Sequence, residues 1–236
     1  MKKPNIISSI LSGCTILEPN QWPQGSGEII LTFDDGPSEK ISTQLLDVLY
    51  KHHVPAVFCY IGKNVSDYPE IANRAIEESH SIAIHTYSHS IQSLLSNNTL
   101  NKETDEFIKL IKSLPSGSNA DLKPFRPPLG LKTPAIRRLV KSRNFDYAYL
   151  TFFVNDAYSK PKDAARIIHK IKCKIKEHDG AAIVFHELRY IDGRDRYEID
   201  KSWLPEAVDE LITWAKSEGY VFSTYKKQIT NRIGID

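Results

Sequence analysis

The stretch "EIILTFDDGPSEK", residues 28–40, joins an apolar run to a pair of adjacent aspartates. The run is typical of a buried β-strand, because β-branched, aliphatic and aromatic residues follow one another without a break. Asp34 and Asp35 come directly after it, and Gly36 and Pro37 then end the strand. Two neighbouring carboxylates at the end of a buried strand repel each other, so we expect a partner that separates their roles.

The composition of the 236-residue chain is that of an ordinary globular protein, with 41% hydrophobic and 25% charged residues. The formal net charge of +2 favours neither nucleic acid nor an anionic membrane as a partner, and it leaves the oligomeric state open. No apolar run reaches the roughly 18 residues of a membrane helix. Cys14, Cys59 and Cys173 are too widely spaced for a disulfide framework or a CxxC metal site, and Cys59 is predicted to lie in the core.

Residues 1–27 are predicted to form an N-terminal segment that precedes one folded domain at 28–236. The sequence "LSGC" at 11–14 resembles the bacterial lipobox, whose cysteine carries a lipid. Pro4, Ser8 and other interruptions shorten an apolar stretch that is already brief for a signal peptide. We therefore expect a cytoplasmic protein, and a lipoprotein of the cell envelope anchored at Cys14 is the alternative.

Strand-like and helix-like segments alternate along the chain. Strands are predicted at 28–33, 55–62, 81–85, 146–154, 181–186 and 220–225, and helices at 41–53, 68–80, 102–114, 133–144, 162–179 and 204–219. Repeated βα units indicate a largely parallel sheet covered by helices, in the α/β class. So many units in one chain favour a closed or nearly closed barrel over an open, doubly wound sheet, and no GxGxxG or GxxxxGK[ST] loop supports the open sheet.

Polar side chains suited to catalysis follow the predicted strands. They are Asp34, Asp35, His85, Asp156 and His186; His89 comes four residues after His85 in "HTYSH", and Arg126 lies in "FRPPLG". In βα barrels such positions meet at one end of the barrel. If the chain turns helically after His85, both imidazoles lie on one face and can share an ion.

One carboxylate and two histidines make a metal site with open positions for water and substrate. The second aspartate would then stay unligated as a base, and the cation would offset the repulsion between the two carboxylates. Each pattern alone has a structural alternative: Asp-Gly is common in turns, and HxxxH also occurs among core or surface histidines. The combination carries the hypothesis.

Five short motifs make the chain resemble the polysaccharide deacetylases, a carbohydrate esterase family built on the NodB homology domain. They are "TFDDGP" (32–37), "HTYSH" (85–89), "RPPLG" (126–130) and, more loosely, "NDAY" (155–158) and "IVFH" (183–186). The resemblance extends over residues 28–225. It implies a single-domain, distorted or incomplete (β/α) barrel.

The resemblance also implies roles for individual residues. Asp34 matches the general base and Arg126 the residue that holds it; His186 matches the general acid and Asp156 the carboxylate that orients it. The metal ligands would be Asp35, His85 and His89, and the substrate-binding residues Tyr87, Pro128, Leu129 and Gly130. The expected cofactor is a divalent metal, most often Zn²⁺, with Co²⁺, Ni²⁺ or Mn²⁺ as alternatives. The expected substrate is an N-acetylated saccharide, from which activated water releases acetate and a free amine.

Two departures from the family pattern bear on the substrate. Leu129 and Ala157 stand where the family often has aromatic residues, which places binding of a long polymer in doubt and favours a smaller or lipid-linked sugar. The charged segment 187–203 is expected to shape specificity. Arg126, Asp156 and His186 each also have a structural alternative, as an ion pair, a turn residue and a core histidine.

Three other functions stay open at this stage. A hydrolase of small amides or cyclic imides on the same fold is one, a non-catalytic carbohydrate-binding relative is the second, and a non-haem iron oxygenase is the third. The chain has no HExxH motif of a zincin protease and no GxSxG motif of a serine hydrolase. A binding module does not need both a base and an acid, so the residue set favours an enzyme.

Overall fold

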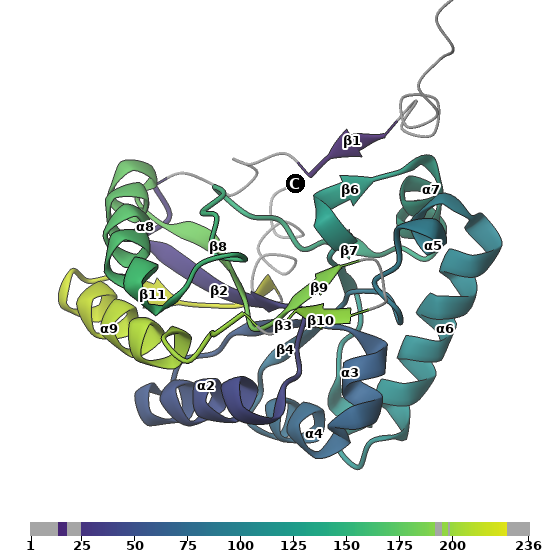
Figure 1. Cartoon of the computed structure of the whole chain (residues 1–236), viewed down its shortest axis with the longest axis horizontal. Coiled ribbons are helices and arrows are strands. Elements are labelled where there is room, and N and C mark those ends of the chain that lie inside the picture. The colour runs from purple at the N-terminus through teal and green to yellow at the C-terminus, as the bar shows by residue number, and fades with distance from the viewer. Residues whose placement is uncertain (1–13, 18–24, 192–194, 198, 226–236) are drawn as a thin grey trace, which may run out of the picture.

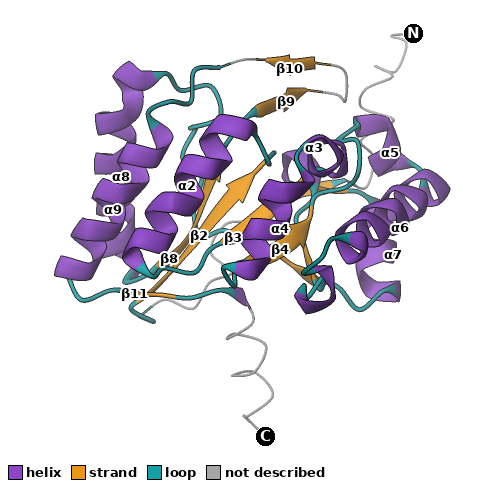
Figure 2. Cartoon of the chain, turned by 90° about the horizontal axis from the view of Figure 1, so that it is seen from below, coloured by secondary structure: helices purple, strands orange, loops and turns teal. Residues whose placement is uncertain are grey.

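A computed structural model describes residues 14–17, 25–191, 195–197 and 199–225. Seven parallel strands form a curled sheet at its centre, and helices pack against the outer face of that sheet (Figures 1 and 2). The strands follow the order β11 (Val221–Phe222), β2 (Glu28–Asp34), β3 (Val57–Tyr60), β4 (Ser81–Ile84), β5 (Pro124–Phe125) and β7 (Asp146–Tyr147), and β8 (Ala181–His186) pairs with β2.

The helices fill the connections between these strands, as in other parallel sheets. They are α2 (Glu39–His52), α3 (Gly62–Asp67), α4 (Pro69–Glu77), α5 (Ile91–Leu95), α6 (Asn97–Ser113), α7 (Pro134–Ser142), α8 (Ala164–His178) and α9 (Leu204–Ser217). Two antiparallel pairs lie outside the main sheet, β1 (Thr15–Ile16) with β6 (Leu131–Lys132) and β9 (Arg189–Ile191) with β10 (Asp195–Tyr197).

The sheet curls until its two ends approach each other. Residues 32–34 of β2 pair with β3 on one side and with β8 on the other. After β7, the backbone N–H of Thr151 donates to the carbonyl of Ala182 in β8 over 2.8 Å, and Ala182 donates back to the Thr151 hydroxyl over 2.9 Å. This short contact replaces a full strand pair. The predicted distorted (β/α) barrel in a single domain is therefore confirmed.

The alternation of side chains along β2 separates the core from the barrel interior. Ile29, Leu31 and Phe33 point outward into the core beneath the helices, whereas Ile30 joins the small residues of the interior. Cys59 lies in that interior cluster, so its predicted core position is confirmed. Asp34 has the same parity as Ile30, and its side chain consequently enters the barrel.

Several predicted boundaries were wrong. The strand predicted at 146–154 ends at Tyr147, because the chain leaves the sheet there and brings Leu150 and Phe153 to the mouth of the barrel. The helix predicted at 68–80 is preceded by a separate short helix, α3, and α4 begins at Pro69, which fits the first turn of a helix. Ser96 caps α6, which begins at Asn97, five residues before the predicted start at 102.

The described part of the predicted N-terminal segment packs onto the domain. Thr15 and Ile16 pair with β6, and Leu17 is buried against Leu150 and Val184. Of the lipobox-like sequence at 11–14, only Cys14 lies within the described residues. In the parts of the chain that the structure describes, no helix has both the length and the apolarity needed to cross a bilayer.

Phe33 tests the packing that holds β2 in place. Its ring stacks between Phe58 and Phe185, with centroids 5.2 and 5.9 Å away. We expect Phe33→Ala to lower the free energy of unfolding by about 3–5 kcal/mol, because the cavity it creates cannot collapse between two strands. Urea denaturation measures this loss.

The matched control is Tyr50→Ala, since the Tyr50 side chain is 65% exposed. This control is expected to change the free energy of unfolding by less than about 0.5 kcal/mol. Equal losses for both variants would show that β2 does not depend on the stacked rings.

Candidate metal-binding and catalytic site

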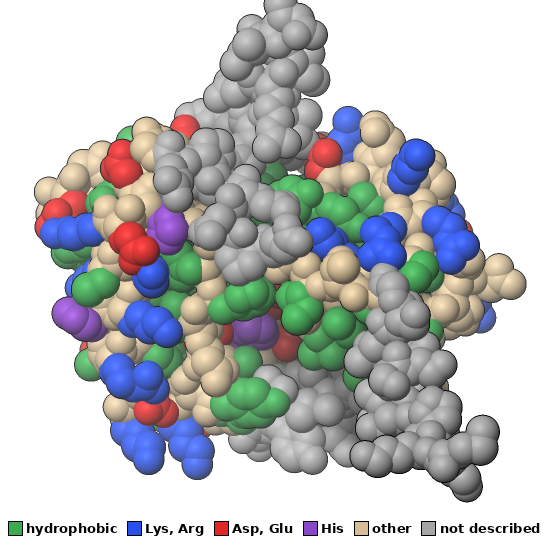
Figure 3. Space-filling view, turned by 90° about the horizontal axis from the view of Figure 1, so that it is seen from above, with side chains coloured by type: hydrophobic (Ala, Val, Ile, Leu, Met, Phe, Trp, Pro, Cys, Tyr) green, Lys and Arg blue, Asp and Glu red, His purple; other side chains and the backbone are tan. Residues whose placement is uncertain are grey.

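The carboxyl ends of the strands surround a small cavity of about 150 Å³. Seen from above, histidine and acidic side chains lie in a hollow between hydrophobic ones (Figure 3). The lining residues are Asp34, Asp35, His85, His89, Arg126, Leu129, Gly130, Leu150, Phe153, Val184 and His186. The barrel therefore brings together most of the residues selected from the sequence.

The turn after β2 aims two consecutive carboxylates at this one cavity. In a continuing strand they would point to opposite faces of the sheet. Asp35 instead adopts a left-handed backbone conformation with φ of 73°, and the side-chain amide of Asn64 donates to its carbonyl over 2.7 Å. The peptide bond between Gly36 and Pro37 is cis. The strand break after Asp34 thus separates the roles of the two aspartates by geometry.

The HTYSH loop does not turn helically, so that part of the prediction was wrong. Thr86 and His89 have left-handed φ angles of 64° and 56°. The loop still places Nε2 of His85 3.3 Å, and Nε2 of His89 3.4 Å, from the same oxygen of Asp35. Glu103 on α6 supports it by accepting the backbone N–H groups of residues 87 and 88 over 3.2 and 3.1 Å and the hydroxyl of residue 88 over 2.6 Å.

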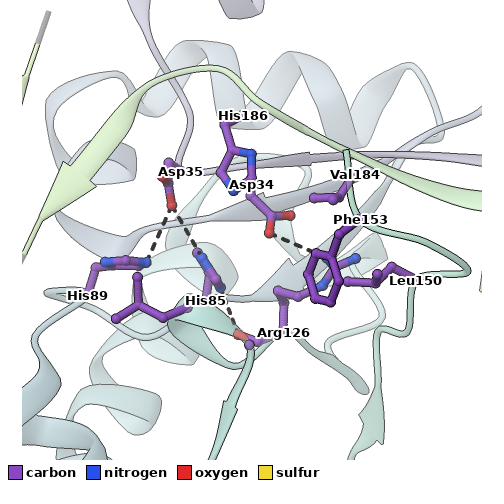
Figure 4. Close-up of a pocket in the computed structure, with 11 residues that line it drawn as sticks. Asp34, Asp35, His85, His89, Arg126, Leu150, Phe153, Val184 and His186 are labelled. Atoms are coloured by element: carbon purple, nitrogen blue, oxygen red, sulfur yellow. Dashed lines mark hydrogen bonds and ion pairs between the residues drawn. The ribbon is translucent and has the colours of Figure 1, made fainter. Parts of the chain in front are cut away.

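The donor chemistry of this cluster fits a cation. Nδ1 of His85 lies 2.7 Å from the carbonyl of Arg126, so Nδ1 carries the proton and Nε2 turns a lone pair toward the Asp35 carboxylate (Figure 4). Burial, only partly offset by the charge of Asp35, lowers the pKa of His89 to about 4, which leaves this imidazole neutral at pH 7. Lone pairs on adjacent atoms repel unless a proton or a metal cation lies between them.

The spacing of the ligand atoms fits the same interpretation. One atom from each of Asp35, His85 and His89 lies within 4.8 Å of the others, and all three residues are buried. Atoms bound about 2.1 Å from one tetrahedral ion lie about 3.4 Å apart, close to the two distances from Asp35. The three side chains can therefore hold one metal ion and leave a further position open.

Asp34 is held by an arginine rather than by the histidines. Nη1 of Arg126 lies 3.4 Å from Oδ2 of Asp34, and Nη2 donates to the Thr32 hydroxyl over 3.1 Å. Burial works against the Arg126 charge, but interactions with Asp34, Cys59 and Tyr225 together raise the pKa of the guanidinium. The other oxygen of Asp34, Oδ1, is buried and has no hydrogen-bond partner among the described residues.

His186 lies on the other side of the two aspartates from His85 and His89 (Figure 4), and it pairs with Asp156. Asp156 accepts Nδ1–H of His186 over 2.8 Å through Oδ1 and its backbone N–H over 2.7 Å through Oδ2. Burial disfavours the imidazolium, but the charge and hydrogen bond of Asp156, with the charges of Asp35 and Asp34, raise the pKa of His186 to about 9. This histidine is a proton donor at pH 7.

Glu187 is a buried carboxyl group that the sequence did not single out. The Ser42 hydroxyl donates to it, and its backbone N–H donates to the carbonyl of Asp34 over 3.0 Å. A Cβ added to Gly36 would lie 2.5 Å from its Oε1, so a larger residue there would displace the Glu187 carboxyl group. Burial and the charges of Asp35 and Asp34 raise the pKa of Glu187 to about 8 against the hydrogen bond from Ser42.

The predicted substrate-binding residues divide into two groups. Leu129 and Gly130 line the cavity, and Leu129 is half-exposed with a left-handed φ of 56°. Pro128 is buried and does not line the cavity. Tyr87 lies outside it, since its hydroxyl bonds to Ser66 over 3.0 Å. Its role in substrate binding stays a prediction.

Other lining residues were missed from the sequence. The sequence pattern places Leu150 and Phe153 in the predicted strand at 146–154, and Val184 in the apolar part of the predicted strand at 181–186. Phe153 is 50% exposed and stands beside Arg126 and Leu150 at the mouth of the cavity (Figure 4). An aromatic ring is therefore present at the site, although position 157 holds an alanine.

Comparison with known proteins identifies relatives over most of the chain. An uncharacterized 30.6 kDa protein of Geobacillus stearothermophilus is 29% identical over 202 residues, which cover 84% of this chain and 69% of that protein. The peptidoglycan-N-acetylglucosamine deacetylase PgdA of Listeria monocytogenes is 26% identical over 196 residues, covering 83% of this chain and 37% of the relative. The chain thus spans little more than a third of that larger relative.

Solved structures share the fold. The Xyl-CE4 domain of a multidomain xylanase from the hindgut metagenome of Trinervitermes trinervoides matches with a TM-score of 0.68 and 25% identity, over 91% of this chain and 93% of the other. A pseudoenzyme of carbohydrate esterase family 4 from Bacillus anthracis matches in fold, with a TM-score of 0.64 and 20% identity over 84% of this chain and 64% of that one.

The family model for polysaccharide deacetylases matches residues 22–148, more than half of the chain. That range contains both aspartates of the turn, both histidines of the loop, and Arg126. The barrel, the shared motifs and this match agree: the chain belongs to the polysaccharide deacetylase family.

Proposed function

We propose that this protein is a metal-dependent hydrolase that removes acetyl groups from an N-acetylated saccharide. One observation carries the proposal: the metal-type cluster of Asp35, His85 and His89 shares a single cavity with Asp34 and with His186. A ligand set, a free carboxylate and a proton donor are the three components that metal-assisted hydrolysis of an amide uses.

Asp35, His85 and His89 would hold the metal, and their mixed oxygen and nitrogen atoms suit Zn²⁺, with Co²⁺, Ni²⁺ or Mn²⁺ as alternatives. When bound, such an ion polarises an acyl oxygen and makes water more acidic. The proton of His85 on Nδ1 is fixed by the carbonyl of Arg126, so Nε2 is preset as a ligand atom.

Asp34 is proposed as the general base. Arg126 holds Oδ2, which orients the carboxylate, and Oδ1 is the oxygen with no partner among the described residues. It can accept a proton from water as the water attacks the acetyl carbon. A positioned base of this kind contributes about 10²–10⁴-fold to the rate.

His186 is proposed as the general acid, with Asp156 as the carboxylate that orients it. The amine that leaves an acetamide is strongly basic and departs only when its nitrogen is protonated. A histidine with a pKa of about 9 carries that proton at neutral pH. The hydrogen bond from Nδ1 to Asp156 leaves Nε2 to deliver it.

The cavity supports a small acyl group as the part of the substrate that enters. Its volume of about 150 Å³ is too small for a chain of sugars, and Leu150 and Val184 give it an apolar wall. Leu129 and Phe153 are half-exposed at the mouth, where an apolar sugar face can lie against them. Pro128 and Gly130 would shape the turn that presents Leu129.

A substrate screen tests the proposal directly. Purified protein loaded with Zn²⁺ is expected to release acetate from N-acetylglucosamine oligosaccharides, and removal of the metal with a chelator is expected to abolish this release until Zn²⁺ is restored. Enzymatic quantification of acetate is the measurement.

Two outcomes of the screen would favour other functions. Hydrolysis of small amides or cyclic imides without acetate release from sugars would favour the second candidate hydrolase. Saccharide binding without hydrolysis would indicate a non-catalytic relative, as in the pseudoenzyme that shares this fold.

Substitutions separate the base from the ligands. We expect Asp34→Asn to bind Zn²⁺ with near wild-type affinity and to lose about 10²–10⁴-fold in kcat, because only the base is removed. His85→Ala is expected to lose both metal and activity. Zinc content and acetate release are measured together, and near-normal turnover by Asp34→Asn would exclude Asp34 as the base.

The pH profile tests the acid. Activity is expected to fall as pH rises through the pKa of His186, because the proton that the leaving amine needs is then lost. The charge of Asp35 contributes to the His186 pKa of about 9, and a cation on Asp35 would weaken that contribution. The decline of activity on the basic side of the profile, its basic limb, should therefore lie at or below pH 9. The measurement is kcat/KM for an N-acetylated oligosaccharide between pH 5 and 10.

Asp156→Asn serves as the matched variant for this profile. It removes the charge that favours the imidazolium, and the basic limb should therefore move to lower pH. An unchanged limb would assign the titration to another group.

A further inference from the structure

A buried lysine lies beneath the pair formed by Asp156 and His186. Nζ of Lys201 donates to the backbone carbonyl of Asp156 over 2.5 Å and lies 3.7 Å from its Oδ2. The side chains of Lys201 and Asp156 are 1% and 0% exposed. An ammonium group taken fully out of water costs several kcal/mol unless a negative charge and hydrogen bonds compensate. Asp156 supplies both.

The lysine also fixes the turn on which Asp156 stands. The Asp156 carbonyl accepts a second hydrogen bond from the N–H of Ser159 over 2.8 Å, and the Ser159 hydroxyl donates to the carbonyl of Asn155 over 2.8 Å. Trp203 donates its indole N–H to the carbonyl of Ser159 over 3.3 Å. Lys201 and Trp203 therefore bind the two ends of this turn, at Asp156 and Ser159.

The route of the chain explains where this lysine comes from. The charged segment 187–203 starts at the residue after His186 and returns to the same place with Lys201. Trp203 covers the lysine, with Nζ 5.6 Å from the centroid of one of its rings. The segment thus begins next to His186, and its residue Lys201 contacts Asp156, the other member of the pair.

We propose that Lys201 is a positioning residue for the proton donor. It holds Asp156 in place, and the Asp156 carboxylate, bonded to Nδ1, in turn holds the His186 imidazole in its position at the cavity. This inference rests on the proposed function, with His186 as the general acid. Without Lys201, the turn would lose one hydrogen bond, and Asp156 would lose the cation near its Oδ2.

If Lys201 acts through the general acid, the rate lost on replacing it depends on the leaving group of the substrate. An amine leaves an acetamide only with a proton from the acid, whereas 4-nitrophenolate leaves its acetate ester as a stable anion without one. Loss of Lys201 should therefore slow amide hydrolysis and spare the activated ester. A lysine that only stabilises the fold would affect both substrates alike.

The experiment compares Lys201→Met with wild-type holoenzyme on N-acetylglucosamine oligosaccharides and on 4-nitrophenyl acetate. We expect kcat on the oligosaccharide to fall at least tenfold with KM within twofold, and kcat on the ester to change less than twofold. Zinc content is expected to equal that of the wild type. Lys201→Gln is measured as well, because it keeps a donor for the carbonyl and removes the charge; it decides the question if Lys201→Met does not fold.

Lys172 offers a matched control. Its Nζ pairs with Glu210 over 2.6 Å and lies 5.5 Å from the Trp214 ring, on the outer helices and away from the cavity. Lys172→Met should leave the amide-to-ester ratio of rates unchanged.

Equal losses on both substrates, or no loss on either, would overturn the role of Lys201. This outcome differs from failure of the proposed function, in which the wild-type holoenzyme itself releases no acetate from any N-acetylated saccharide.

Discussion

The carboxylate of Asp35 faces Nε2 of His85 at 3.3 Å and Nε2 of His89 at 3.4 Å, and the arrangement of the site depends on this contact. The hydrogen bond from His85 to the carbonyl of Arg126 places a lone pair, and not a proton, on the facing nitrogen. Such a close cluster of a carboxylate and two ring nitrogens is stabilised by a positive charge among them, which a shared proton or a metal ion can supply. The left-handed conformation of Asp35 and the strained loop around His89 both serve to bring these atoms together.

The barrel interior tolerates its polar residues because each buried charge has a partner that compensates it. Arg126 is almost completely buried, and it is compensated by Asp34 and by the Thr32 hydroxyl, which in turn donates to the carbonyl of Ile183 over 2.9 Å. Small side chains such as Ala83 and Ala182 leave room for the guanidinium. The two aspartates can therefore stand side by side because each has a different partner, a metal-type cluster for one and an arginine for the other.

The two sides of the site are carried by different parts of the chain. The ligand cluster, Asp34 and Arg126 all fall within the region matched by the family model, residues 22–148. Asp156 and His186 lie beyond it, on a turn and a strand, and the segment 187–203 follows that strand and returns to the turn with Lys201. In this second part the motifs depart most from the family pattern, and a buried lysine, Lys201, contacts the aspartate that bonds the proposed acid.

The sequence alone determined the fold class and nearly all of the polar residues of the site. Alternating apolar periodicities predict the strands and helices, and the polar residues follow directly at the strand ends, so local patterns are sufficient to find them. Only the tertiary structure decided the left-handed turns at Asp35 and His89, the placement of Tyr87 outside the cavity, and the positions of Phe153 at the cavity and of Lys201 beside Asp156. These features depend on contacts between segments far apart in the chain, and a local pattern carries no information about which distant side chain completes a buried charge.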